Sequence, residues 1–284
     1  LGFLWGERFV ADTLGPGEFS LRLVPLAASV LACVLIHFLL RRMLPSGGYA
    51  IAFSVFAFAT PVIRYAAEVK PYAVDLAVTL ALLLLLFWVE RRPVTIARAV
   101  AIALAGCVSV WLAFPAVSVL GGIGAVYFVH SVYAKDRRRA AAFSFIGAAW
   151  LVSLAFDYVL MLRYNTNNAE VRTWWLDRFM PLPPGSLSDL NWFVRTFFEV
   201  FAEPLGLGAG SLGALLFLLG VYALWGRDRL RLALLLAPIG VALLASGLQM
   251  YPFMGRFLIF LVPMMVVLIG EGWTFLAANV QRRA

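Results

Sequence analysis

The sequence predicts an all-α fold, a polytopic bundle of transmembrane helices that forms a single domain over residues 1–284. Hydrophobic residues make up 63% of the chain and charged residues only 13%. A soluble domain is about half apolar and about a quarter charged, so lipid is the expected surroundings of this chain. No stretch shows the alternating pattern of a β-barrel. Helices are therefore expected, because in lipid they satisfy their backbone hydrogen bonds within one segment.

About nine apolar segments are long enough to be spans, since a membrane-crossing helix needs roughly 20 predominantly apolar residues. The second and the fourth are short. The segments cover residues 20–40, 48–63, 71–89, 97–113, 115–133, 140–161, 209–225, 232–250 and 256–276.

The basic residues predict the orientation of the bundle. Short connections rich in Lys and Arg stay on the cytoplasmic side of a membrane. More than half of the 23 basic residues lie in alternate connections and at the C-terminus, namely Arg41, Arg42, Arg91, Arg92, Arg98, Lys135, Arg137, Arg138, Arg139, Arg227, Arg229, Arg231, Arg282 and Arg283. We expect a multi-pass protein of the cell inner (plasma) membrane with a cytoplasmic C-terminus. We expect the basic residues behind the net charge of +8 to interact with the membrane surface, and no nucleic acid partner is expected.

Two segments on the predicted outer face are amphipathic but too polar to span. Residues 1–14 form one, and residues 189–203 form the other, in which Arg195 and Glu199 belong to a polar stripe at helical spacing. Such segments are expected to lie on the membrane as interfacial helices. Ser188 or Asp189 is the expected N-cap of the second.

A metal centre is not predicted from the cysteine and histidine residues. Cys33 and Cys107 both fall inside apolar segments, and His37 and His130 are far apart near the ends of spans. Neither pair has the spacing of a disulfide framework or of a zinc site.

Two bases, one acid and two tyrosines fall within the connection between the second and third predicted spans: Arg64, Tyr65, Glu68, Lys70 and Tyr72. A charge at the bilayer centre costs about 2.5–3.5 kcal/mol on insertion scales, so ionisable groups in this position are unusual. Two interpretations stay open. The connection is either a functional site or an ordinary interfacial loop with snorkelling bases and tyrosines at the membrane surface.

Asp75 and Arg256 are further candidates for the same site. Asp75 falls in the first turns of the third span, where an acid has to face other helices, water or a cation. Arg256 is one of several bases on the predicted outer side. A lipid-linked phosphate would suit these bases, because a guanidinium group pairs with two phosphate oxygens, and pairing with nearby acids is the alternative.

With these residues in view, the chain resembles the GT-C superfamily of polytopic glycosyltransferases, and within it the protein-mannosyltransferase-like and Rgt-type bacterial enzymes. Residues 1–14 with 17–25 look like their interfacial helix and the span after it. Residues 65–73, Tyr-Ala-Ala-Glu-Val-Lys-Pro-Tyr-Ala, look like their tyrosine, acid, base and tyrosine signature. The basic connections repeat their topology, and residues 251–258 with Pro263 resemble their late outer loop and following span.

The resemblance implies an enzyme that moves a hexosyl or pentosyl group from a polyprenyl-phosphate donor to a lipid, glycan or protein acceptor at the outer (periplasmic) face. It implies Glu68 as a catalytic acid, and it implies Arg64, Lys70 and Arg256 as contacts to the donor phosphate. Tyr65, Tyr72 and Asp75 are the further substrate-binding candidates. Some members of the superfamily use a divalent metal ion, and no other cofactor is expected.

Such enzymes place their main catalytic acid in the first outer loop. The resemblance therefore implies that the domain is truncated at its N-terminus, without its first span and first outer loop, so that this acid lies upstream of Leu1 and the chain alone is inactive. A transporter or flippase for a lipid-linked glycan is the alternative, for which broken helices around midplane charges would be expected. A noncatalytic membrane assembly partner is a third interpretation, which needs no acid and bases at one interface.

Overall fold

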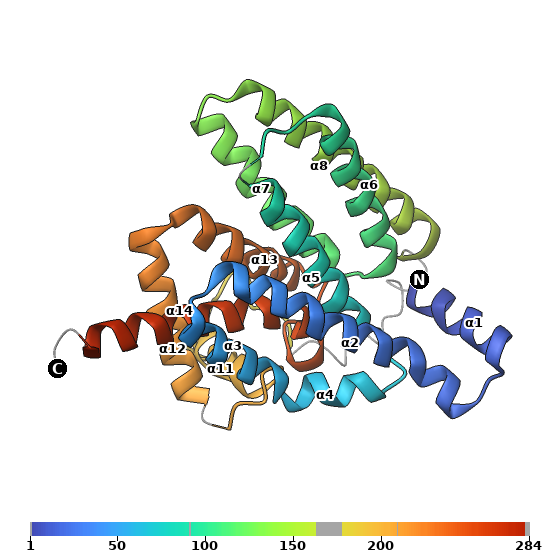
Figure 1. Ribbon diagram of the computed structural model, residues 1–284, viewed down its shortest axis with the longest axis horizontal. Helices are drawn as coiled ribbons and strands as arrows, with labels where there is room; N and C mark the ends of the chain where they lie inside the picture. Colours follow the sequence, from blue (N-terminus) through green and yellow to red (C-terminus); the bar gives the residue numbers. More distant parts are fainter. Residues whose placement is uncertain (1, 91, 163–177, 209, 282–284) are drawn as a thin grey trace.

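The computed structural model describes residues 2–90, 92–162, 178–208 and 210–281 (Figure 1). Within these ranges the chain is all-α and contains no β-strand. Seven of its helices are long and apolar enough to cross a membrane, or eight if one bent pair of helices counts as a single span. The predicted all-α polytopic bundle is thus confirmed.

The helices follow one another in the order α1 (Gly2–Leu14), α2 (Glu18–Met43), α3 (Ser46–Ala57), α4 (Thr60–Ala67), α5 (Tyr72–Val89), α6 (Ile96–Leu112), α7 (Ala116–Tyr133), α8 (Arg137–Asp157), the π-helix η1 (Tyr158–Leu162), α11 (Leu187–Ala202), α12 (Gly210–Arg227), α13 (Arg229–Gly247), the 3₁₀-helix η3 (Gly255–Leu261) and α14 (Val262–Gln281). Each of the nine predicted spans coincides with helix. Two of the nine differ from a simple span, which is why the structure has seven or eight rather than nine.

The second predicted span is broken into α3 and α4, whose axes differ by 48°. Pro61 stands in the first turn of α4, where its missing N–H group leaves no hydrogen bond unmade. The fourth predicted span is α6, an apolar helix of only 17 residues.

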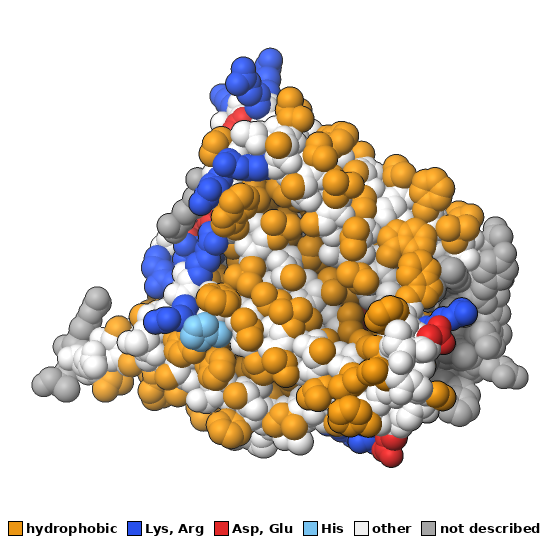
Figure 2. Space-filling model, turned by 45° about the vertical axis from the view of Figure 1, so that its right-hand side comes forward, with side chains coloured by type: hydrophobic (Ala, Val, Ile, Leu, Met, Phe, Trp, Pro, Cys, Tyr) orange, Lys and Arg blue, Asp and Glu red, His pale blue; other side chains and the backbone are white. Residues whose placement is uncertain are grey.

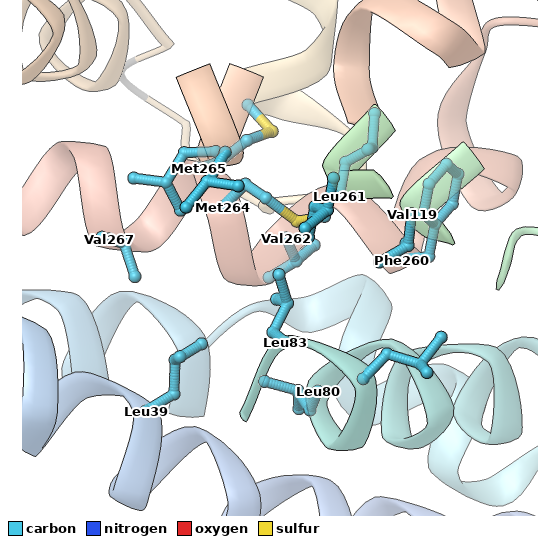
Figure 3. Packing of buried hydrophobic residues seen from close by; sticks show 14 of the residues in the cluster. Leu39, Leu80, Leu83, Val119, Phe260, Leu261, Val262, Met264, Met265 and Val267 are labelled. Atoms are coloured by element: carbon cyan, nitrogen blue, oxygen red, sulfur yellow. The ribbon is translucent and has the colours of Figure 1, made fainter. Parts of the chain in front are cut away.

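Helix α14 is the centre of the bundle. Its residues from Val262 to Gly272 are all buried, and Figure 3 shows several of them facing leucines of α2 and α5. Glycines bring the neighbouring helices close: a Cβ atom on Gly270 would lie 2.7 Å from the carbonyl oxygen of Gly48 on α3. A Cβ atom on Gly220 or Gly272 would collide with the backbone of the facing helix in the α12–α14 pair. Small residues stabilise helix pairs in membranes in this way, through close backbone contact.

Helices α6, α7 and α8 lie side by side and project from the rest of the bundle (Figure 1). Trp150 of α8 fills the space over Gly106 of α6, and its indole N–H donates to the carbonyl oxygen of Ile102 at 3.4 Å. The hydroxyl group of Tyr127 on α7 donates to the carbonyl oxygen of Leu86 on α5 at 3.0 Å, and this hydrogen bond joins the projecting helices to α5.

Lys and Arg side chains line one edge of the molecule (Figure 2). Arg42 donates to the carbonyl oxygen of Phe87 at 2.5 Å, and Arg139 donates to the carbonyl oxygen of Glu90 at 3.2 Å, so three basic connections meet there. We call this edge the basic end; its described bases are Arg41, Arg42, Arg92, Arg98, Lys135, Arg137, Arg138, Arg139, Arg227, Arg229 and Arg231. The cytoplasmic location of this end stays a prediction.

Both predicted amphipathic helices are present, as α1 and α11. Helix α11 packs its aromatic side on α12, where Phe197 and Phe201 contact Phe217. On its polar side Arg195 and Glu199 form an ion pair at 2.6 Å. The predicted N-cap at Ser188 or Asp189 is wrong. Ser186 caps the helix, and the carboxylate of Asp189 accepts from the N–H group of Ser186 at 2.9 Å, so the two form a capping box and the helix begins earlier than expected.

Candidate functional site

The connection between α4 and α5 places an acid between two bases. Arg64 lies in the last turn of α4, and Glu68 follows four residues later, which puts both side chains on one face. The helix ends at Ala67, and Glu68 already has an extended backbone. A tight turn follows, in which the N–H group of Lys70 donates to the carbonyl oxygen of Glu68 at 2.8 Å, and Pro71 then caps α5. The turn brings Lys70 back towards Glu68.

Each carboxylate oxygen of Glu68 is held by a different base. Nε of Arg64 lies 2.6 Å from Oε1, and Nζ of Lys70 lies 3.0 Å from Oε2. The Glu68 side chain is 27% exposed, so the carboxylate is open to solvent on one side. The hydrogen bond from Arg64, and next the one from Lys70, hold the pKa of Glu68 below its ordinary value of 4.5. Glu68 is therefore an ionised carboxylate at neutral pH.

Two tyrosines, Tyr65 and Tyr72, lie beside this cluster. The guanidinium carbon of Arg64 lies 5.8 Å from the ring centre of Tyr65, and Nζ of Lys70 lies 6.0 Å from it. Tyr65 is buried and meets Tyr72 edge to face, with ring centres 4.8 Å apart. The aromatic faces add attraction for both cations, since a ring face carries partial negative charge.

Arg256 is distant from the Glu68 cluster in sequence but lies at the same end of the bundle. Its guanidinium carbon lies 5.3 Å from the ring centre of Phe257, and the Phe257 ring lies 6.1 Å from that of Tyr72. Tyr251 locks this turn, because its hydroxyl group donates to the carbonyl oxygen of Phe257 at 2.7 Å. The start of η3 is thereby fixed against the start of α5. The convergence of Glu68 and Arg256 on one cavity stays a prediction.

Asp75 lies one turn into α5 and apart from the Glu68 cluster. Its side chain is buried, at 8% exposure. In the described part of the chain, no Lys or Arg forms an ion pair with Asp75. The structure therefore brings together Arg64, Tyr65, Glu68, Lys70, Tyr72 and the turn of Arg256, and it sets Asp75 beneath them.

Glu203 is a residue of this region that the sequence did not single out. It follows α11, and its carboxyl carbon would lie 3.3 Å from a Cβ atom on Gly255, the residue before Arg256. Its charge also acts on the guanidinium group of Arg64. The backbone just beyond it packs on α4, where a Cβ atom on Gly206 would lie 2.9 Å from the nitrogen of Thr60. Glu203 thus lies against the start of η3, and the chain that follows it lies against α4.

An apolar cavity of about 310 Å³ opens beside η3. Leu258 and Leu261 of η3 line one wall, only a few residues from Arg256. The other walls come from α11, α12, α13, the connection before η3 and the start of α14, with Trp192, Phe193, Thr196, Phe197, Val200, Phe201, Phe217, Leu236, Ile239, Leu243, Phe253 and Met265. Its walls suit a hydrocarbon chain rather than a sugar.

Among the described residues, no group of three or more His, Cys, Asp or Glu side chains is placed to hold a metal ion. Comparison of the chain with models of known protein families, with curated proteins and with solved structures gave no match.

Proposed function

We propose that this protein is a membrane glycosyltransferase that moves a sugar from a polyprenyl-phosphate donor to an acceptor at the outer face of the cell inner membrane. The observation that carries the proposal is the Glu68 carboxylate, held between Arg64 and Lys70 beside the turn of Arg256. The motif resemblance of residues 65–73 supports the same reaction.

The reaction needs a base for the acceptor and cations for the leaving group. The acceptor oxygen bonds to the anomeric carbon, its proton passes to a carboxylate, and the carbon–oxygen bond to phosphate breaks with its electron pair on the phosphate. Glu68 is the proposed proton acceptor among these residues. Arg64, Lys70 and Arg256 are the proposed partners of the phosphate, because a positive charge stabilises the developing phosphate dianion.

Donor binding and activation of Glu68 are coupled in this scheme. In the free protein both oxygens of Glu68 are engaged by bases, and a carboxylate with a lowered pKa is a poor proton acceptor. A donor phosphate competes for Arg64 and Lys70. When it draws them away, the pKa of Glu68 rises towards its ordinary value and one oxygen is freed for the acceptor. The base is then activated only when the donor is present.

The apolar cavity beside η3 is the proposed place for the first isoprenoid units of the donor. Leu258 and Leu261 line it, and Arg256 stands at the start of the same short helix. One segment would then hold both the phosphate and the hydrocarbon of one lipid.

The test is transfer of labelled sugar from a panel of polyprenyl-phosphate hexoses and pentoses, measured in membranes of cells that express the full-length protein. Glu68→Gln should lower transfer by about 100-fold or more, because an amide cannot accept the proton. Glu199→Gln is the matched control, since Glu199 forms an ion pair with Arg195 at the same 2.6 Å and the same spacing on α11. Its transfer should be unchanged.

Transfer by Glu68→Gln at the rate of the unchanged protein would refute the assignment of Glu68. Movement of the donor lipid between leaflets, without any glycosylated product, would instead support the alternative of a transporter.

A further inference from the structure

A second cavity lies at the basic end, far along the helices from Glu68. It has a volume of about 1090 Å³ and lies between the α5–α6 connection and the first turns of α8. Its polar wall contains Arg92, Arg138 and Arg139, together with the acids Glu90 and Asp136.

The arginines of this cavity keep donors that no acid uses. In the described residues no ion pair joins Arg92, Arg138 or Arg139 to a carboxylate. Arg92 is stacked on Trp88, with 4.5 Å from its guanidinium carbon to the ring centre. Arg139 donates once to the carbonyl oxygen of Glu90, while its Nε finds no hydrogen-bond partner within the described part of the chain. The guanidinium groups of Arg92 and Arg139 are held in place without an acidic partner among the described residues, and such groups are suited to a phosphate group.

Neither of the two acids forms an ion pair with these arginines in the described part of the chain. The side chain of Asp136 is committed to capping α8, where Oδ1 accepts from the backbone N–H of Arg139 at 3.0 Å. Helix α6 also begins at this cavity, with Thr95 as its cap and Ile96 as its first residue. The N-terminus of a helix carries partial positive charge, which adds to that of the arginines.

The remaining wall is apolar and faces outward. Ile96 is 86% exposed and Phe145 is 56% exposed, and both line the cavity. Exposed apolar side chains continue from there along α6, at Leu104 and Val108. A ligand that fits such a site has an anionic head and hydrocarbon chains, whereas a free phosphate ion would leave the apolar wall without a partner.

We propose that this cavity binds the phosphate headgroup of an anionic phospholipid, with its acyl chains along the exposed face of α6. Arg92, Arg138 and Arg139 bind the phosphate oxygens, and Ile96 and Phe145 contact the glycerol and the first methylene groups. The site is independent of the proposed sugar transfer, since it shares no residue with the Glu68 cluster. Basic recesses between transmembrane helices recognise anionic lipids by the same chemistry.

The experiment counts lipids retained by the purified full chain in native mass spectrometry, with phosphatidylglycerol and phosphatidylcholine as probes. Phosphatidylglycerol should bind about tenfold more tightly than phosphatidylcholine, because its headgroup carries a net negative charge that the zwitterionic headgroup of phosphatidylcholine lacks. The double variant Arg92→Gln, Arg138→Gln should lose this preference. Both side chains are exposed, so the variant should fold, which its unchanged thermal unfolding would verify.

The matched control is the double variant Arg41→Gln, Arg229→Gln, which removes the same charge from the basic end outside the cavity. Arg229 is stacked on Trp225 at 5.2 Å much as Arg92 is on Trp88. The control should keep the preference for phosphatidylglycerol. An equal loss in both variants would overturn the proposal in favour of general surface attraction. Displacement of phosphatidylglycerol by millimolar inorganic phosphate would overturn it in favour of a site for a soluble anion.

Discussion

Glu68 and Glu271 are each held by an arginine at 2.6 Å, yet the two ion pairs differ in almost everything else. The Glu68 side chain is 27% exposed, and its partners, Arg64 and Lys70, lie within four residues of it along the chain. The Glu271 side chain is 2% exposed on α14, and its partner Arg227 lies on α12. One pair is local and open, and the other joins two helices inside the bundle.

The difference indicates which of the two acids is able to exchange its partners and take part in a reaction. A buried carboxylate depends on its one partner, because the low dielectric of its surroundings makes an unpaired charge very unfavourable. Glu271 is also next to Gly272, where α12 and α14 touch backbone to backbone. An open carboxylate with two bases can exchange a base for a ligand while water and the second base still stabilise it. Glu271 is thus suited to stability, and Glu68 to chemistry.

Removal of each arginine should separate the two roles. Arg227→Ala leaves the Glu271 carboxylate without its partner and should lower the free energy of unfolding by about 3 kcal/mol. Arg64→Ala should change it by less than about 1 kcal/mol, since an exposed pair contributes little. The measurement is unfolding in mixed detergent micelles, with Arg229→Ala as a control for the loss of a base at the basic end. Equal losses for Arg227→Ala and Arg64→Ala would remove the distinction.

The local parts of this picture could be predicted from the sequence. The spacing of Arg195 and Glu199 predicted α11, and the cluster around Glu68 was visible because its members are within nine residues. The break before α4 is not predicted, because the apolar run continues across it and residues 48–63 therefore look like one span. Pro61 is the residue that marks the break.

The long-range contacts could not be predicted in the same way. The pairing of Glu271 with Arg227 depends on the close approach of α12 and α14, and the position of Glu203 beside Gly255 depends on how the chain after α11 packs on α4. Spacing along one helix shows which residues share a face, but it does not show which helix that face will meet.

A paired substitution sharpens the comparison further. If the Arg227–Glu271 pair serves stability alone, then replacing both residues by Met should recover most of the stability that Arg227→Ala loses, because apolar side chains of similar size need no partner. The double variant should unfold within about 1 kcal/mol of the unchanged protein and retain the proposed sugar transfer. A double variant that is stable but inactive would show that Glu271 has a role in the reaction.

The smallest expected effect is a shift in pH dependence at Glu68. The hydrogen bonds from Arg64 and Lys70 lower its pKa below 4.5, so the carboxylate form is present well into the acidic range and is lost as the pH falls through that lowered pKa. The acidic limb of kcat/KM for the proposed sugar transfer would report this group in the protein without donor. In Arg64→Gln the limb should move up towards 4.5, and in Lys70→Ala it should move up less, because Arg64 has the larger effect. Arg195→Gln removes an equivalent base from α11 and should leave the limb in place. An acidic limb that ignores Arg64 and Lys70 would mean that another group accepts the proton, and that Glu68, like Glu271, holds its bases only for structure.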